Sequence, residues 1–334
     1  MRAIVCNEYG PPDRLAEQDV EIPNYHPDEV RIRVRTAGVN FPDTLIIQGK
    51  YQLKPPLPFI PGFEVAGEIT AIGSQVTTHS IGDRVMALTS SGYGAFAEQA
   101  VAKAREVVSV PDGIDDITAT ALYTAYGTAY HALVQRGQIR HGETLVVLGA
   151  SGSVGLAAVE IGVALGARVI AVGRSLDKLS VARKKGATDI LSYSEGDLRQ
   201  RIKELTDGKG ADICLDTLGG DAFDAMSYAM NWNGRLLVIG FTSGVIPRLA
   251  VNLLLLKGYQ VIGVYWGSFV SRSPEINAAN FEVLARMLKQ GQICTYVSKT
   301  YPLAQVGDAL RDLSSRNTIG KLVITVAPES EIGT

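Results

Sequence analysis

A glycine-rich turn between an apolar segment and a helical one constrains the fold of this chain more than any other feature. Residues 145–155 read Leu-Val-Val-Leu-Gly-Ala-Ser-Gly-Ser-Val-Gly, a Gly-x-x-Gly-x-x-Gly spacing that departs from the usual Gly-x-Gly-x-x-Gly. In such a turn, backbone N–H groups at the positive end of a helix can approach a pyrophosphate. Glycine also occurs in purely structural turns, but this turn follows a strand and opens a series of strands and helices. We therefore predict a dinucleotide site here.

Strands and helices alternate beyond this turn. After the strand at 144–148, the expected strands are residues 168–172, 190–192, 212–216, 236–239 and 259–264, most of them separated by helical segments. This alternation predicts an α/β fold with a doubly wound parallel sheet, a Rossmann domain, over residues 119–266. Residues 267–334 add a helix at 280–289 and a strand at 322–326.

The first part of the chain, residues 1–118, has the pattern of short strands and turns. Between Glu29 and Arg35, apolar residues and arginines alternate strictly, which is typical of a half-buried strand. Prolines at positions 55, 56, 58 and 61 exclude regular structure just before Gly62. We expect a small β-rich domain here.

Length and composition restrict the class of protein. A chain of 334 residues is long enough for about two domains, and a content of 46% hydrophobic residues excludes a disordered protein. The formal charge of −2 argues against nucleic acid or a membrane surface as a general partner, and no apolar run could cross a bilayer. Three cysteines far apart and an early polar N-terminus predict a cytoplasmic protein without a signal peptide.

The end of the second strand predicts which dinucleotide binds. Enzymes that use NAD usually place Asp or Glu there to bind the ribose 2′-hydroxyl, whereas this chain has Gly173, followed by Arg174 and Lys178. These two cations can bind a 2′-phosphate, and a cation at the start of a helix opposes the helix dipole. We expect NADPH as the cofactor, with two merely solvated cations as the alternative.

Several ordered motifs support a family assignment. They are Ala37-Gly38-Val39-Asn40-Phe41-Pro42-Asp43, Gly49-Lys50-Tyr51, Pro61-Gly62-Phe63-Glu64-Val65-Ala66-Gly67, Ala125-Tyr126-Gly127-Thr128-Ala129, the glycine turn, and the segment from Gly234 to Phe241. Over nearly the whole chain they resemble the medium-chain dehydrogenase/reductase superfamily, specifically its zinc-free quinone oxidoreductase branch. The resemblance implies a GroES-like catalytic domain of residues 1–118 and 267–334, with an NADPH-binding domain of residues 119–266 inserted.

The resemblance also implies the residues that bind NADPH. They are Thr128, Gly152, Ser153, Val154, Gly173, Lys178, Tyr193, Phe241 and Arg316, and the charge argument adds Arg174. Tyr193 would lie near the adenosine end, or it is an ordinary partly buried tyrosine. The branch further implies a homodimer in which the apolar segment 259–266 pairs across a two-fold axis. A helix that covers this sheet edge is the alternative.

The zinc ligands of related enzymes are missing. Zinc-dependent relatives place Cys after the Gly-Val pair and His-Glu after the Pro-Gly pair, where this chain has Asn40 and Phe63-Glu64. Catalytic zinc takes three protein ligands and structural zinc four, and the four histidines show no such spacing. We expect a metal-free enzyme.

Without a metal, the substrate must accept hydride readily, as quinones and α,β-unsaturated carbonyls do. Asn40 can donate a side-chain N–H to a developing oxyanion, and Tyr51 can donate its hydroxyl. A turn Asn and a tyrosine packed beside the proline-rich loop are the plainer alternatives, and only the resemblance favours catalytic roles. Asp43 is expected to organise the loop or to cap residues 44–47.

Two other functions stay open. One is reduction of an enoyl thioester of coenzyme A, an acryloyl-CoA-type reductase, in which Arg248, Arg272 and Lys299 are candidates to bind the phosphates. The other is an NADPH-binding protein without physiological catalysis. Turnover with an electrophilic acceptor separates the second alternative from a reductase.

Overall fold

A computed structural model gives the fold and describes residues 1–327. The chain forms two compact units. The first unit contains residues 1–124, 269–281 and those from 295 onward, and the second contains residues 125–268 and 282–294. Three helices contribute to both units: α2 (Asp116–Tyr130), α8 (Trp266–Arg272) and α9 (Pro274–Lys289). Three of the borders between the units, at 124/125, 268/269 and 281/282, fall inside these helices, and the fourth lies at 294/295, after α9. The expected division of the domains at 118/119 and 266/267 stays a prediction.

The second unit is built around a six-stranded parallel sheet with the order β10-β9-β8-β11-β12-β13. Its strands are β8 (Thr144–Leu148), β9 (Arg168–Gly173), β10 (Asp189–Ser192), β11 (Ala211–Asp216), β12 (Met230–Val238) and β13 (Gln260–Gly263). Its other helices are α3 (Ser153–Ala164), α4 (Leu176–Lys184), α5 (Leu198–Leu205), α6 (Gly220–Ala229) and α7 (Asn252–Lys257). The strand order reverses between β8 and β11, and ligands of such sheets bind at the carboxyl ends of the strands beside this point.

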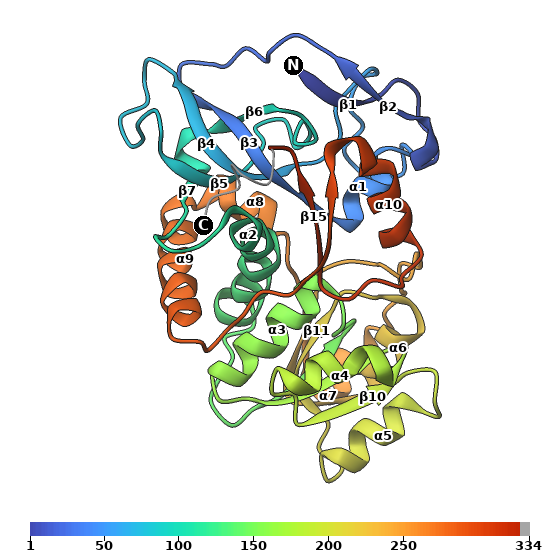
Figure 1. The fold of residues 1–334 in the computed structure, drawn as a ribbon. Helices are drawn as coiled ribbons and strands as arrows, with labels where there is room; N and C mark the ends of the chain where they lie inside the picture. Colours follow the sequence, from blue (N-terminus) through green and yellow to red (C-terminus); the bar gives the residue numbers. More distant parts are fainter. Residues whose placement is uncertain (328–334) are drawn as a thin grey trace. The chain divides into compact units, whose positions relative to one another are not determined.

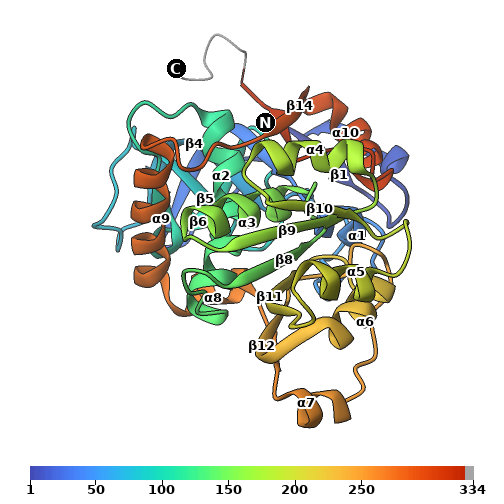
Figure 2. The ribbon, with the colours of Figure 1, turned by 90° about the horizontal axis from the view of Figure 1, so that it is seen from below.

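Helices cover both faces of this sheet. Figure 2 shows α3 and α4 on one side of it and α5 and α6 on the other. Burial on both faces explains why β8 is a continuous apolar run, since all four residues from Leu145 to Leu148 are fully buried. The doubly wound parallel sheet predicted from the alternation of strands and helices is confirmed.

The first unit is β-rich. Its seven-stranded sheet has the order β14-β15-β3-β4-β5-β7, with β6 also paired to β3, and β1 and β2 form a separate two-stranded sheet (Figure 1). The strands and helices are β1 (Arg2–Cys6), β2 (Leu15–Asp19), β3 (Glu29–Val39), α1 (Phe41–Ile46), β4 (Glu64–Ile72), β5 (Arg84–Leu88), β6 (Gln99–Lys103), β7 (Val108–Ser109), β14 (Val297–Pro302), α10 (Val306–Ser314) and β15 (Lys321–Thr325). In β3, Val30, Ile32 and Val34 are buried, which confirms the predicted alternation.

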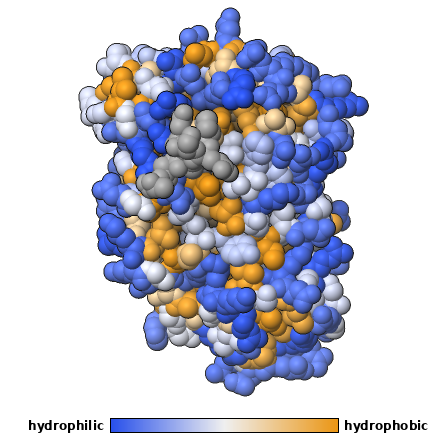
Figure 3. All heavy atoms as spheres, in the orientation of Figure 1, coloured by the Kyte–Doolittle hydropathy of each residue, from blue (hydrophilic) through white to orange (hydrophobic). Residues whose placement is uncertain are grey.

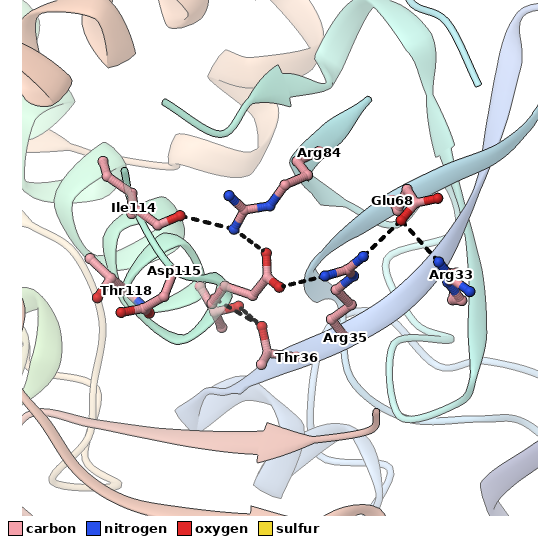
Figure 4. Close-up of polar contacts among 10 residues, drawn as sticks. Arg33, Arg35, Thr36, Glu68, Arg84, Ile114, Asp115 and Thr118 are labelled. Atoms are coloured by element: carbon pink, nitrogen blue, oxygen red, sulfur yellow. Dashed lines mark hydrogen bonds and ion pairs between the residues drawn. The ribbon is translucent and has the colours of Figure 1, made fainter. Parts of the chain in front are cut away.

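A network of ion pairs joins the start of α2 to the sheet of the first unit (Figure 4). The carboxylate of Asp116, in the first turn of α2, is fully buried and lies 2.7 Å from the guanidinium of Arg84 and 3.6 Å from that of Arg35. Arg35 also donates to Glu68 on β4 at 2.7 Å. Because a buried carboxylate is costly unless it is paired, these contacts determine where α2 begins relative to the sheet.

Candidate functional site

Two glycines of the turn after β8 are required by the fold itself. Gly149 has a φ of +79°, and a Cβ added to it would lie 2.2 Å from the hydroxyl oxygen of Thr217. A Cβ on Gly155 would lie 2.2 Å from the carbonyl oxygen of Gly149. Neither position therefore accepts a side chain, whether or not a ligand binds.

The glycine between them is different. Gly152, the N-cap of α3, has a φ of −79°, which any residue can adopt, and an added Cβ would have only the carbonyl oxygen of Gly149 within 4 Å, at 3.5 Å. The first bond of the helix runs from the N–H of Leu156 to the carbonyl of Gly152, so the N–H groups of Ser153 and Val154 precede the helical ladder. The fold does not require glycine at 152, and the absence of a side chain there leaves room for a phosphate to approach these N–H groups.

Thr217 connects the loops at the carboxyl ends of three strands. Its hydroxyl donates to the carbonyl of Leu148 at the end of β8, at 2.9 Å. Its own carbonyl accepts both the N–H and the hydroxyl of Thr242, in the loop after β12, at 3.0 and 2.9 Å. Sequence analysis missed this residue, and the signal that could have found it is its place directly after a buried strand and before the glycine pair at 219–220.

Asp216, the last residue of β11, shapes the same edge. Its carboxylate is buried and accepts the N–H groups of Leu218 and Gly219 at 2.8 and 3.0 Å. Burial raises the pKa of Asp216 to about 6, although these two hydrogen bonds oppose the shift. Phe241 lies beside this turn, because a Cβ on Gly219 would come within 2.9 Å of its ring.

The end of β9 brings together four of the predicted cofactor residues. The carbonyl of Gly173 accepts the N–H of Tyr193 at 3.0 Å, and the carbonyl of Arg174 accepts the hydroxyl of Ser192 at 2.8 Å. Burial lowers the pKa of Lys178, and the nearby charge of Arg174 lowers it further. Two cations this close repel each other, which an anionic ligand would relieve.

The remaining two predicted cofactor residues lie elsewhere. Thr128 is buried in the part of α2 that belongs to the second unit. Arg316 belongs to the first unit, directly after α10, and has a φ of +57°. Their contacts with a cofactor stay a prediction.

Asn40 lies between β3 and α1, and its side chain is held on both sides. Its amide nitrogen donates to Glu64 at 2.9 Å and to the carbonyl of Gly38 at 3.3 Å. Its amide oxygen accepts a hydrogen bond from the ammonium of Lys321 at 2.7 Å. Glu64 and Lys321, which sequence analysis left without a role, form a buried ion pair of 2.5 Å.

Asp43 was expected to organise the loop or to cap residues 44–47, and it is the third residue of α1, so it lies inside the helix. One carboxylate oxygen accepts the backbone N–H of Asn40 at 2.8 Å, and the other is buried without a hydrogen-bond partner. Burial, assisted by the charge of Glu64, raises the pKa of Asp43 to about 8 against the opposing effects of Asn40 and Lys321. The carboxyl therefore carries a proton at neutral pH.

Tyr51 is partly buried and packs against the apolar core of the first unit. It follows Gly49, whose φ is +66° and which lies against the ring of Tyr9. The hydroxyl of Tyr9 donates to the carbonyl of Pro55 at 2.6 Å, so Tyr9 anchors both ends of the segment that carries Tyr51.

Comparison with known proteins agrees with this arrangement. The family described as "Alcohol dehydrogenase GroES-like domain" matches residues 26–112, and the one described as "Zinc-binding dehydrogenase" matches residues 153–284. The chain is 36% identical to quinone oxidoreductase-like protein 2 homolog of Nematostella vectensis, over 97% of this chain and 88% of that protein. It belongs to the quinone oxidoreductase branch of the medium-chain dehydrogenase/reductase superfamily. The predicted family and the GroES-like fold of the first unit are thus confirmed.

Two further members of this branch are similar along their whole length. Quinone oxidoreductase of Pseudomonas aeruginosa is 34% identical, over 95% of this chain and 97% of that protein. The structure of Escherichia coli quinone oxidoreductase complexed with NADPH has a TM-score of 0.91 and 27% identity, over 98% of this chain and all of that one. A quinone oxidoreductase fold is therefore known to hold NADPH in a relative.

Among residues 1–327, no cluster of three or more His, Cys, Asp or Glu side chains is arranged to hold a metal ion. No helix there combines the length and apolar character needed to span a membrane. On the face shown in Figure 3, apolar side chains gather in separate groups among polar ones. Metal-independent activity and a cytoplasmic location stay predictions.

Proposed function

We propose that this chain uses NADPH to reduce quinones or α,β-unsaturated carbonyls. The open space at Gly152, in front of the N-terminus of α3, is the observation that carries the cofactor assignment. The adjacent cations Arg174 and Lys178 support NADPH over NADH, because the 2′-phosphate is the group that distinguishes the two. The relatives named quinone oxidoreductase support the class of acceptor.

In this proposal the second unit binds and orients the cofactor. The N–H groups of Ser153 and Val154 donate to the pyrophosphate, while Arg174 and Lys178 bind the 2′-phosphate. Bound NADPH supplies a hydride. Thr128, Gly173, Tyr193, Phe241 and Arg316 complete the cofactor contacts.

The first unit supplies donors for the acceptor. Negative charge develops on the acceptor's oxygen during reduction, and a donor aimed at that oxygen stabilises the transition state. Asn40 offers an amide N–H, and Tyr51 offers a hydroxyl that also carries a transferable proton. Either group acts here without a metal ion.

The function is tested by NADPH oxidation against a panel of quinones, enones and enoyl-CoA esters. We expect turnover with quinones and enones, and a Tyr51→Phe variant that slows an enone by up to about 10²-fold but a benzoquinone much less. The NADPH affinity of this variant should equal that of the parent chain. NADPH binding without turnover of any acceptor would leave a binding protein without catalysis, and a preference for the thioesters would favour an acryloyl-CoA-type reductase.

The thioester alternative depends on three basic residues. Lys299 already forms an exposed ion pair of 3.3 Å with Asp312, so binding a phosphate would require it to exchange partners. Arg272 belongs to the first unit and Arg248 to the second, and both are exposed. No observation favours this alternative over the quinone or enone reductase.

We also propose a homodimer through the second unit. β13 is an edge strand of the six-stranded sheet, and an open edge can pair with a second copy. Exposed apolar side chains concentrate in the connection that precedes it: Val245, Ile246, Val251, Leu255 and Leu256, of which Leu255 is 82% exposed. A dimer would bury both features.

A further inference from the structure

We propose that Lys321 and Glu64 are positioning residues, a buried ion pair that holds the amide of Asn40 in the orientation needed to donate to the acceptor. This inference rests on the proposed function, and it adds two residues that act through Asn40 rather than on the substrate. It also gives a reason for the charge of Lys321 at a position where lysine is rarely found.

The ion pair is deeply buried, and both of its members make further hydrogen bonds. The side chain of Lys321 is 2% exposed and that of Glu64 is not exposed at all. One oxygen of Glu64 accepts from Lys321 and Asn40, and the other accepts the N–H of Thr124 on α2 at 2.7 Å. An apolar pair of similar volume often stabilises a fold as well as a buried ion pair does. Stability alone is therefore a weak reason for these charges.

The pair determines which way the amide of Asn40 faces. An amide can be turned over with almost no change of shape, so only its hydrogen-bond partners distinguish oxygen from nitrogen. The ammonium of Lys321 can only donate and therefore selects the oxygen of Asn40, whereas the carboxylate of Glu64 can only accept and selects the nitrogen. The second amide hydrogen points to the carbonyl of Gly38 at 3.3 Å, the longest of these bonds. This hydrogen can leave the carbonyl of Gly38 and donate instead to the oxygen of an acceptor.

The sheet is built so that these residues can meet. β15 and β4 are the two neighbours of the C-terminal part of β3 (Figure 1), Lys321 is the first residue of β15, and Glu64 is the first residue of β4. The two side chains meet over Gly38 on β3, where a Cβ would lie 2.0 Å from a carboxylate oxygen of Glu64 and 2.9 Å from Cε of Lys321. Any side chain at position 38 would displace the pair.

A purely structural role, in which the pair only fastens β15 to β3 and β4, is the competing explanation. The two explanations differ in what they predict when the charges are removed and the shape is kept. Lys321→Met alone would leave Glu64 buried without its cation, so the variant to use is Lys321→Met combined with Glu64→Gln. The matched control is Lys185→Met with Glu160→Gln, which removes a largely buried ion pair of 2.8 Å in the second unit.

The kinetic test compares these variants with Asn40→Ala for an enone acceptor. We expect the Lys321/Glu64 double variant to lose about 10- to 100-fold in kcat with an unchanged KM for NADPH, and the control pair to lose little. Adding Asn40→Ala to the double variant should cause no further loss, because the residue is already misplaced. An unchanged kcat in the double variant, or a full additional loss on adding Asn40→Ala, would overturn the proposal.

A second measurement does not depend on turnover and separates this inference from the proposed function. The side-chain amide signal of Asn40 is identified in ¹⁵N NMR spectra by its absence from Asn40→Ala, and its hydrogen exchange is measured. We expect slow exchange in the parent chain and in the control pair, and exchange at least about tenfold faster in the Lys321/Glu64 variant. Equal exchange in all three proteins would refute the positioning role, even if the chain reduces quinones and enones. If no acceptor is reduced but exchange accelerates, only the proposed function fails.

Discussion

The replacement of Gly152 by alanine tests the cofactor site against the fold. The backbone at this position is open to any residue, and the nearest atom to the new Cβ would be a carbonyl oxygen at ordinary contact distance, 3.5 Å. In the chain without cofactor, Gly152→Ala should therefore change the free energy of unfolding by less than about 1 kcal/mol, because the gain from restricting the unfolded chain is offset by the weaker preference for alanine at an N-cap. Its effect on NADPH binding should be larger.

The magnitude for NADPH follows from the bonds that the new methyl group would block. Pyrophosphate is charged, and each hydrogen bond from an N–H of Ser153 or Val154 to a charged group contributes about 1.5–3 kcal/mol. Loss of one such bond corresponds to about 10- to 100-fold in Kd. Gly155→Ala is the contrasting variant, because its Cβ would lie 2.2 and 2.8 Å from backbone atoms of Gly149 and Ala150. Such overpacking should destabilise the fold itself by about 1–3 kcal/mol.

Two measurements separate the variants. Thermal unfolding without cofactor gives the effect on the fold, and titration with NADPH gives the effect on binding. Gly152→Ala should leave the melting temperature nearly unchanged and weaken NADPH binding, whereas Gly155→Ala should lower the melting temperature. An unchanged NADPH affinity in Gly152→Ala would refute the reasoning, since it would mean that no phosphate approaches the start of α3.

Four other predictions concern cofactor choice, pH, metals and assembly. Replacing Arg174 and Lys178 together by alanine should weaken the binding of NADPH by about tenfold or more and the binding of NADH only little. Equal affinity of the parent chain for both cofactors would contradict this. The pKa of Asp43 is raised to about 8 from about 3.9 in an unfolded chain. The stabilisation of the fold by the protonated carboxyl is therefore complete below about pH 4 and is lost as the pH rises towards 8. Asp43→Asn keeps an oxygen for the N–H of Asn40. The melting temperature of this variant should therefore fall less between about pH 5 and about pH 8 than that of the parent chain. Activity should survive chelation, with no stoichiometric zinc by elemental analysis, and loss of activity that zinc restores would contradict it. Light scattering should give the mass of a dimer, and a monomer mass at micromolar concentration would count against pairing through β13.

The second unit of the protein could be predicted closely from the sequence. The strand before the glycine turn, the helix after the turn and the cations after β9 all lie within about 35 residues of one another. The local sequence pattern is therefore enough to predict them. The last strand was expected at 259–264 and is β13 (Gln260–Gly263), since Val264 is already beyond the sheet and α8 begins at Trp266. The helix expected at 280–289 begins earlier, at Pro274.

The surroundings of Asn40 could not be predicted in the same way. Lys321 lies 281 residues after Asn40 in the chain, and nothing near either residue signals the other. They meet only because β15 and β3 pair antiparallel with Leu322 opposite Val39. A shift of that register by one residue would turn the side chain of Lys321 to the other face of the sheet. Thr217 was missed for a similar reason, since its partners are Leu148 and Thr242, on two other strand ends.

The difference between the two units follows from what each is proposed to bind. A pyrophosphate is bound by backbone N–H groups at the start of a helix. The sequence signal of such a site is a short run of small residues, which can be recognised without the structure. A donor for the acceptor's oxygen must be one side chain in one orientation, and here that orientation depends on an ammonium and a carboxylate from two other strands. The residue type of Asn40 alone therefore predicts little. Its chemistry depends on the charges of Lys321 and Glu64, and a chain with the same local motif but without this pair should be expected to place its amide differently.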